Sequence, residues 1–169
     1  QVYNNNIIDG KGTGILNQGA GGQYIYNNLI VNAGRDYYPL DQTRQQFGIF
    51  SKSTFLNPAE PLFHFYNNTI INPKSDGIRI MNSLSESNRL INNLIINPGA
   101  YDYYKNLGSV NFEASDAYIH NYLDRADISS FNHIFARSSK FQFFADTLNY
   151  DYHLTENSLA VNVGFDLST

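Results

Sequence analysis

The sequence predicts an all-β solenoid, and three observations support this prediction. One seven-residue pattern recurs along the chain. The apolar positions of the pattern are β-branched or aromatic, in runs of a few residues, and Asn, Gly, Pro, Asp and Ser separate the runs. The copies follow one another at the period of about 20 to 50 residues that is typical of solenoids. Leucine-rich repeats are excluded because their leucine scaffold is absent.

The repeat is clearest at residues 66–72, where it is Tyr-Asn-Asn-Thr-Ile-Ile-Asn. The related segments are 3–9, 26–32 and 91–97, with a fainter fifth copy at 119–123. Because the copies begin at residues 3, 26, 66, 91 and 119, the base period is about 23 to 25 residues, with insertions in some copies. Each copy therefore corresponds to one coil of the predicted solenoid.

Paired asparagines mark a tight turn inside each copy. Asn tolerates the left-handed backbone conformation, and its amide can bond along a column of identical residues in successive coils. Asn67 and Asn68 are therefore predicted to join two short strands at a sharp corner. The aromatic residues that precede the pairs, at positions 3, 26 and 66, are predicted to form a cross-strand stack.

A second repeated element begins with glycine and supplies a third strand to each coil. It starts at Gly14, Gly48 and Gly77 and, less clearly, at Gly108. In the third coil the strands are predicted at 62–66, 69–71 and 77–81, before residues 89–90 open the next coil. If each strand pairs with its counterpart one coil along, about 4.8 Å away, the result is a right-handed parallel β-helix of about five coils.

The coils are predicted to occupy residues 1–123 and a C-terminal cap residues 124–169, within one structural domain. Phenylalanines are dense after residue 124, which is typical of a lid on the last coil. At the other end the repeat is already under way at residue 3, which predicts an open strand edge. We expect preceding coils of a longer protein, or another chain, to cover that edge.

The coil pattern resembles the pectate-lyase-like superfamily of parallel β-helices over residues 2–123. In addition, residues 151–164 resemble the D-[YF]-x-L-x-x-x-S-P-A-[IV]-[DN]-x-G ending of many secreted bacterial β-helix proteins, with Leu159 in place of the usual proline. This resemblance implies a bacterial protein that is secreted or held at the cell surface.

Composition narrows the range of partners. The chain has 169 residues, of which 42% are apolar and 15% charged, an ordinary balance for a soluble globular domain, and it has no long apolar run. A membrane span is therefore not predicted. The net charge of −4 argues against nucleic acid as the main partner. No cysteine is present and no metal-ligand spacing occurs, so no metal site is predicted, although a calcium requirement stays open.

Three insertions, at 33–47, 53–61 and 98–106, flank the glycine-led strands. Long loops on a regular scaffold concentrate binding residues, although a tolerated surface insertion would look the same. Tyrosines and arginines in two of these loops are typical of a carbohydrate platform. The residues are Arg35, Tyr37, Tyr38, Arg44, Tyr103 and Tyr104.

Strand alternation predicts which residues of the glycine-led sheet face outward. One outward column is Leu16, Phe50, Arg79 and Asn111, and the next is Gln18, Lys52, Met81 and Glu113. Glycoside hydrolases need two carboxyl groups about 5 to 9.5 Å apart, and these columns offer only Glu113. If the protein is an enzyme, a polysaccharide lyase is therefore favoured over a glycoside hydrolase.

A lyase that cleaves uronates needs positive charge to offset the carboxylate and a base to take the C5 proton. The resemblance to the superfamily implies Lys52 as that base and Arg79 as the charge stabiliser. Arg89 adds a further cation for substrate binding. The alternative is that these cations are ordinary solvated surface residues.

The sequence thus predicts recognition of an acidic polysaccharide, and it leaves open whether the protein also cleaves that polysaccharide by β-elimination. The competing hypothesis is a non-catalytic, adhesin-like surface module that binds glycan or protein. An enzyme should place Lys52 and Arg79 on one groove beside a carboxylate or cation, whereas a binding module should show coplanar tyrosines and dispersed cations.

Overall fold

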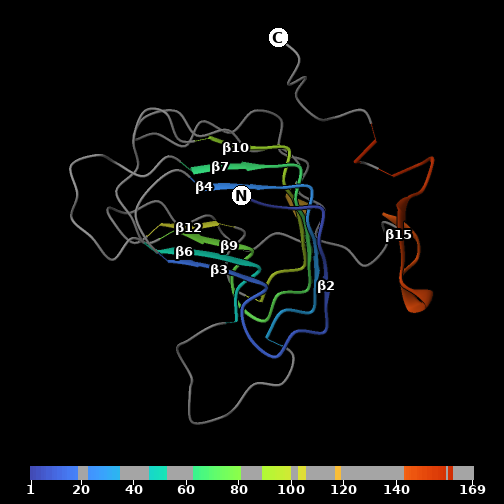
Figure 1. Cartoon of the computed structure of the whole chain (residues 1–169). Helices are drawn as coiled ribbons and strands as arrows, with labels where there is room; N and C mark the ends of the chain where they lie inside the picture. Colours follow the sequence, from blue (N-terminus) through green and yellow to red (C-terminus); the bar gives the residue numbers. More distant parts are fainter. Residues whose placement is uncertain are drawn as a thin grey trace.

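The computed structural model describes residues 1–18, 23–34, 46–52, 63–80, 89–99, 103–105, 117–118, 143–158 and 160–161; of residues 52, 63, 80, 89, 103–105 and 117–118 it describes the backbone alone. Over these ranges the protein is all-β apart from one short 3-10 helix; its strands form three sheets, in which strands of successive repeats lie side by side and are largely parallel, and a separate hairpin (Figure 1). No helix within these ranges is long and apolar enough to cross a membrane.

The first sheet contains one strand from each of four consecutive repeats. In spatial order the strands are β1 (Val2–Tyr3), β4 (Gln23–Tyr26), β7 (Phe63–Tyr66) and β10 (Arg89–Ile91), all parallel. Their register aligns the equivalent repeat positions, for example Ile25 with Phe65 and Phe65 with Leu90. The predicted pairing of each strand with its counterpart one repeat along is confirmed for this sheet.

The second sheet follows the asparagine corner. Its parallel strands are β2 (Asn6–Ile8), β5 (Leu29–Val31), β8 (Thr69–Ile71) and β11 (Leu94–Ile96). Beyond β11 the prediction of a fifth parallel copy is wrong, because the edge of β11 is occupied by the antiparallel strand β13 (Ala117–Tyr118). The strand β13 runs opposite to β11. The faint copy at 119–123 has only one asparagine of the pair, and it lies outside the described residues.

The third sheet contains β3 (Ile15–Gln18), β6 (Ile49–Lys52), β9 (Ile78–Ile80) and β12 (Tyr103–Lys105). Its last strand corrects a prediction, because β12 lies beside β9 where the strand led by Gly108 was expected. The reason is spacing: β3, β9 and β12 each begin seven residues after the end of the preceding second-sheet strand, at residues 8 to 15, 71 to 78 and 96 to 103. Asp102 stands where the other repeats have glycine, so this strand lacks the sequence marker of the others.

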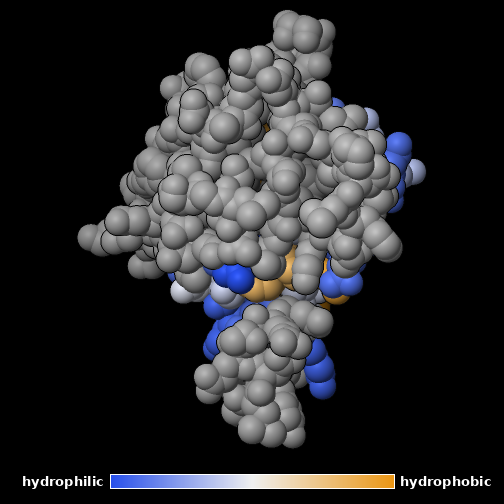
Figure 2. All heavy atoms as spheres, turned by 90° about the vertical axis from the view of Figure 1, so that its left-hand side faces the viewer, coloured by the Kyte–Doolittle hydropathy of each residue, from blue (hydrophilic) through white to orange (hydrophobic). Residues whose placement is uncertain are grey.

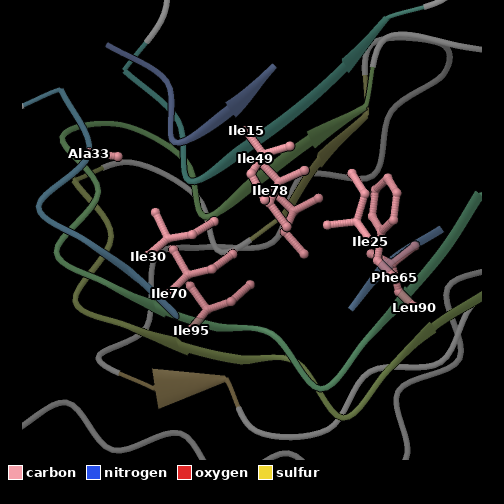
Figure 3. Packing of buried hydrophobic residues seen from close by; sticks show 10 residues of the cluster. All are labelled: Ile15, Ile25, Ile30, Ala33, Ile49, Phe65, Ile70, Ile78, Leu90 and Ile95. Carbon is pink, nitrogen blue, oxygen red and sulfur yellow. The ribbon is translucent and has the colours of Figure 1, made fainter. Parts of the chain in front are cut away.

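The core lies between the three sheets, where one column of side chains from each sheet meets the other two (Figure 3). All the labelled side chains are buried. The columns are Ile25, Phe65 and Leu90; Ile30, Ile70 and Ile95; and Ile15, Ile49 and Ile78. On the face shown in Figure 2, a small apolar surface of the described residues is bordered by hydrophilic ones.

The two asparagines of each pair have different tasks. The first, at positions 4, 27, 67 and 92, has a left-handed backbone with φ between 51° and 56°. The second forms a largely buried amide column: Asn28 Nδ2 donates to Asn68 Oδ1 at 2.9 Å, and Asn68 Nδ2 donates to Asn93 Oδ1 at 2.7 Å. Asn68 Nδ2 also donates to the Ile25 carbonyl at 2.9 Å, so the amide links neighbouring repeats. The predicted corner and asparagine column are both present.

The C-terminal hairpin, β14 (Phe144–Asp146) and β15 (Asp151–Leu154), packs on the outside of the second sheet (Figure 1). Phe143 and Phe144 are buried against Val31, Ile71 and Leu94, which belong to β5, β8 and β11. The described part of the predicted cap therefore packs along the outer side of the second sheet. The physical reason is the apolar column on the outer face of this sheet, which the hairpin buries. The other phenylalanines on which the prediction of a lid depends lie outside the described residues.

Candidate functional site

Three predicted site residues lie on adjacent strands of the third sheet. The register pairs Leu16 with Phe50, Phe50 with Arg79 and Arg79 with Tyr104. Strand alternation predicts the first three members of this row, and Tyr104 stands where Asn111 was expected. The outer face of the sheet thus brings an aromatic residue, a cation and a tyrosine position into one line across β6, β9 and β12.

Asp76 and Phe47 are described neighbours that hold Arg79. Its Nε donates to Asp76 Oδ2 at 2.5 Å, and its guanidinium carbon lies 4.3 Å from the centroid of the Phe47 ring. Asp76 is fully buried, whereas the Arg79 side chain is 22% exposed. Because an arginine beside a buried carboxylate and over an aromatic face is fixed in orientation, the guanidinium is preorganised. The same carboxylate offsets its positive charge.

Lys52, the predicted base, ends β6, where its backbone pairs with Gln18. Since Phe50 is the register partner of Arg79, Lys52 lies two residues farther along the adjacent strand, a backbone offset of about 8 Å from strand geometry. The two predicted catalytic positions are therefore on neighbouring strands. The course of the Lys52 side chain lies outside what the structure describes.

The other predicted binding residues divide into two groups. Arg89 is on β10 of the first sheet, in register with His64, and Tyr103 is on β12 in register with Ile78. Arg89 is thus on a different sheet from Arg79. The remaining predicted residues lie outside the described residues: Arg35, Tyr37, Tyr38, Arg44, Asn111 and Glu113.

Aromatic residues also line up on the first sheet. The Tyr3 and Tyr26 rings are parallel within 1°, with centroids 4.9 Å apart, and Tyr24 lies 4.8 Å from His64. The Tyr66 hydroxyl lies 2.5 Å from His64 Nδ1. The predicted cross-strand stack is confirmed for Tyr3 and Tyr26. The other ring pairs of this sheet are not stacked: Tyr24 is tilted by 44° to His64, and His64 meets Tyr66 edge to face.

A groove that the sequence does not predict lies between the hairpin and the turns that follow the second-sheet strands. Its volume is about 500 Å³. Its lining residues come from the turns and from residues 147–152: Asp9, Asn32, Ala33, Asn72, Lys74, Thr147, Leu148, Tyr150 and Tyr152. An adjoining hollow of about 600 Å³ extends it along the buried side of the hairpin.

A second side-chain column contributes Asp9, Asn32 and Asn72 to the floor of the groove and continues to Asn97. Asp9, Asn32, Asn72 and Asn97 all have left-handed backbones, with φ between 48° and 57°. Asn97 Nδ2 donates to Asn72 Oδ1 at 2.9 Å, Asn72 Nδ2 to Asn32 Oδ1 at 3.2 Å, and Asn32 Nδ2 to Asp9 Oδ1 at 2.7 Å. The repeated final residue of each sequence copy is the visible signal for this column.

The hairpin turn forms the opposite wall. Asp146 caps the 3-10 helix Thr147–Asn149 by accepting from the backbone N–H groups of Leu148 and Asn149. The hydrogen bond from the Asn149 side chain is the main cause that lowers the pKa of Asp146. Burial, followed by the charge of Asp9, raises the pKa of Tyr152, so this phenol stays neutral at physiological pH.

Within the described residues, no group of three or more His, Cys, Asp or Glu side chains gathers as a metal site would require. Comparisons of the chain with protein-family models, with curated proteins and with solved structures find no match.

Proposed function

We propose that this protein is a right-handed parallel β-helix of the pectate-lyase-like kind that binds an acidic polysaccharide on the outer face of its third sheet. The observation that carries the proposal is the preorganised Arg79, held between buried Asp76 and the Phe47 ring and flanked in register by Phe50 and Tyr104. The polysaccharide lies across β6, β9 and β12.

Two features support the architecture in this proposal. Each of the first four repeats contributes one strand to each of three sheets. In the second repeat a longer connection, from Val31 to Ile49, separates the second strand from the third. The buried amide column joins successive repeats at one corner, as expected for coils that stack in register. By its resemblance to secreted bacterial β-helix proteins, we place the protein outside the cell or on its surface.

The chemistry of the row fits a chain of uronate sugars. A guanidinium presents N–H groups in a planar fork that matches a carboxylate, and such charge-assisted pairs are among the stronger hydrogen bonds. The centroid of the Phe50 ring lies 5.2 Å from that of the Phe47 ring. The Phe50 ring supplies an apolar surface on which the C–H face of a sugar can pack. Binding is favoured over catalysis because Asp76 already offsets the charge that would stabilise an enolate.

Elimination is the second candidate, supported by the adjacent strands of Lys52 and Arg79. In that reaction Lys52, as a neutral amine, takes the C5 proton of the uronate. The electron pair forms the C4–C5 double bond as the C4–oxygen bond breaks, and the oxygen of the next sugar leaves with the bonding electrons and takes a proton from water to become a hydroxyl group. Arg79 would stabilise the charge that develops on the carboxylate.

The test is calorimetric titration of the protein with polygalacturonate and with alginate, each with and without calcium. Phe50→Ala and Arg79→Lys should weaken binding about tenfold, or about 1.4 kcal/mol. Lys at position 79 retains a charge for Asp76 but lacks the planar fork. The matched control is Lys11→Gln, an exposed cation on the turn before β3, which should bind as tightly as the parent protein.

Absorbance of unsaturated uronate ends, followed in the same mixtures, separates the two candidates. Binding without a rise in absorbance supports a binding protein and excludes the lyase. A rise that Lys52→Ala abolishes would establish elimination on this face. Absence of binding to both polymers, or equal losses in the Lys11→Gln control, would overturn the proposal.

A further inference from the structure

The amide column in the groove has hydrogen-bonding capacity beyond the column itself. Each amide has two N–H donors and two acceptor lone pairs. Asn72 gives one N–H to Asn32 and accepts one bond from Asn97, and Asn32 gives one N–H to Asp9. Within the described part of the chain, the Asn32 and Asn72 side chains make no bonds beyond these, and Asn72 is exposed. A second donor and a second acceptor therefore recur at strand spacing along the floor.

The opposite wall of the groove, formed by the hairpin, presents aromatic and aliphatic side chains. Tyr150 is 60% exposed and Leu148 is 90% exposed, and both line the groove with Tyr152. Tyr150 is the C-cap residue of the 3-10 helix, and its backbone adopts the left-handed conformation there, with φ of 61°. An exposed aromatic residue facing paired donors and acceptors matches a sugar, which has an apolar face and rows of hydroxyl groups.

The charges of the groove indicate which kind of sugar. Among the described residues that line it, Asp9 and Lys74 are the only ionisable ones apart from the two tyrosines, so their opposite charges leave this lining close to neutral. Asp9 is placed at the end of the column, where its carboxylate accepts from Asn32. The third-sheet row differs, because its carboxylate, Asp76, is fully buried and only the guanidinium of Arg79 is partly exposed.

We propose that this groove is a second binding site, which takes a neutral glycan. The Asn32 and Asn72 amides bind its hydroxyl groups, and Tyr150 packs on a sugar face. The inference does not depend on the proposed function, because it rests on the second-sheet turns and the hairpin, whereas the acidic polysaccharide is assigned to the third sheet. The two sites would let one protein bridge two polymers of different charge.

The test is titration of the whole chain, by NMR and calorimetry, with neutral oligosaccharides prepared from cellulose, xylan, mannan and galactan. At least one should bind and shift the Asn32 and Asn72 side-chain amide signals. Tyr150→Asn removes the ring while keeping a residue that adopts the left-handed backbone, and it should weaken binding about tenfold. Asn72→Gly removes the amide at another left-handed position and should have a similar effect.

Leu154→Ser is the matched control, because Leu154 is 41% exposed on the same hairpin and does not line the groove. It should bind the neutral sugar like the parent protein, and Phe50→Ala should do so too. Absence of binding across the panel, or equal binding by the parent protein and both groove variants, would overturn the inference. Loss of polygalacturonate binding in Tyr150→Asn would overturn the assignment to a neutral sugar, whereas failure of the third-sheet variants alone would affect only the proposed function.

Discussion

The paired asparagines show how one residue type serves two physical purposes at neighbouring positions. Asn67 supplies a left-handed backbone conformation, which costs most other residues about 1 to 2 kcal/mol. Asn68 is fully buried; its amide donates to the Ile25 carbonyl and to Asn93 Oδ1, and accepts from Asn28 Nδ2. The first task depends on the backbone and the second on the side chain, so substitutions should separate them.

We expect Asn68→Ala to lower the free energy of unfolding by about 2 to 3 kcal/mol, because it leaves buried donors and acceptors of the column without partners. Asn67→Ala should cost about 1 kcal/mol through its backbone alone, and Asn67→Gly should be close to neutral. Urea unfolding followed by circular dichroism measures all three. Equal losses in Asn68→Ala and Asn67→Gly would contradict this division of tasks.

The turn that carries Tyr150 should respond to acid. The pKa of Asp146 is lowered by hydrogen bonds from Asn149 and Leu148, so the folded turn favours the ionised carboxylate. The stabilisation is therefore present above the ordinary pKa of an aspartate and is lost as the pH falls through the lowered value. The backbone amide signal of Leu148 should move over that acidic range.

Asp146→Asn provides the control for this titration. It keeps an acceptor at the cap but removes the titrating charge, so the Leu148 signal should no longer follow the pH. The pKa of Asp151 is also lowered, chiefly by its hydrogen bond from the His153 backbone, so it too would titrate below the ordinary pKa of an aspartate. A Leu148 titration that survives in Asp146→Asn would assign the effect to Asp151 instead.

At the scale of the elements, the glycine that leads each third-sheet strand is required by close packing. A Cβ at Gly14 would lie 2.5 Å from the Ile30 side chain and 2.7 Å from the Gly48 carbonyl, and a Cβ at Gly48 would meet Ile70 and the Gly77 carbonyl in the same way. The recurring contact is with the second-sheet core column. The glycine therefore allows the second and third sheets to meet closely at this corner.

We expect Gly48→Ala to destabilise the protein by about 1 to 3 kcal/mol, the usual cost of overpacking. Gly10→Ala is the matched control, because a Cβ there would have its nearest neighbours at 3.9 Å. Its unfolding free energy should change little. Thermal unfolding of both variants is the measurement. A Gly48→Ala variant as stable as Gly10→Ala would contradict the expectation, because it would show that a methyl group fits between the second and third sheets.

Element prediction succeeds where the repeat carries its markers and fails where a marker is lost. In the third repeat the predicted strands at 62–66, 69–71 and 77–81 match β7, β8 and β9 within one residue at each end. The strand β12 escapes prediction because it has no leading glycine, and β13 because a reversal of direction leaves no trace in a period. Periodicity reports local chain geometry, whereas strand direction at an edge depends on tertiary pairing.

At the scale of the whole molecule, the hairpin is attached to the stack by a small apolar contact. Phe144 is buried, packs edge-on against Tyr152 at 5.6 Å and shares a cluster with Val31 and Ile71. Phe144→Ala should cost about 3 kcal/mol of local stability by removing a buried ring. Leu148→Ala, at a side chain 90% exposed on the same hairpin, should cost little.

Hydrogen exchange distinguishes local from global effects of that substitution. Faster exchange confined to residues 144–154 would show that the hairpin opens independently of the three sheets. Faster exchange throughout the described strands would instead show that the hairpin and the stack unfold together. The groove would be lost in either case, so Phe144→Ala should also lose the neutral-glycan binding proposed above.

The candidate sites differ in how far sequence alone can reveal them. Alternation along β6 and β9 is sufficient to place Phe50 and Arg79 on one outward row, and the register of the two strands agrees with it. The Asp76 and Phe47 contacts that fix Arg79 cannot be foreseen, because they depend on side-chain orientation at a corner. The groove cannot be foreseen either. It lies between turns at residues 9, 32–33 and 72–74 and the hairpin residues 147–152, and these distant parts of the chain come together only in the folded structure.

The unequal spacing of the repeats bears on the order in which the protein folds. Stacking β4 on β7 closes a segment of 40 residues, from position 26 to 66, whereas stacking β1 on β4 or β7 on β10 closes 23 or 25. Loop-closure entropy makes the longer step costlier by about 0.5 kcal/mol. The first and second repeats should therefore pair early to form one folding nucleus, and the third and fourth repeats another. The pairing of β4 with β7, which joins these two halves, should then limit the folding rate.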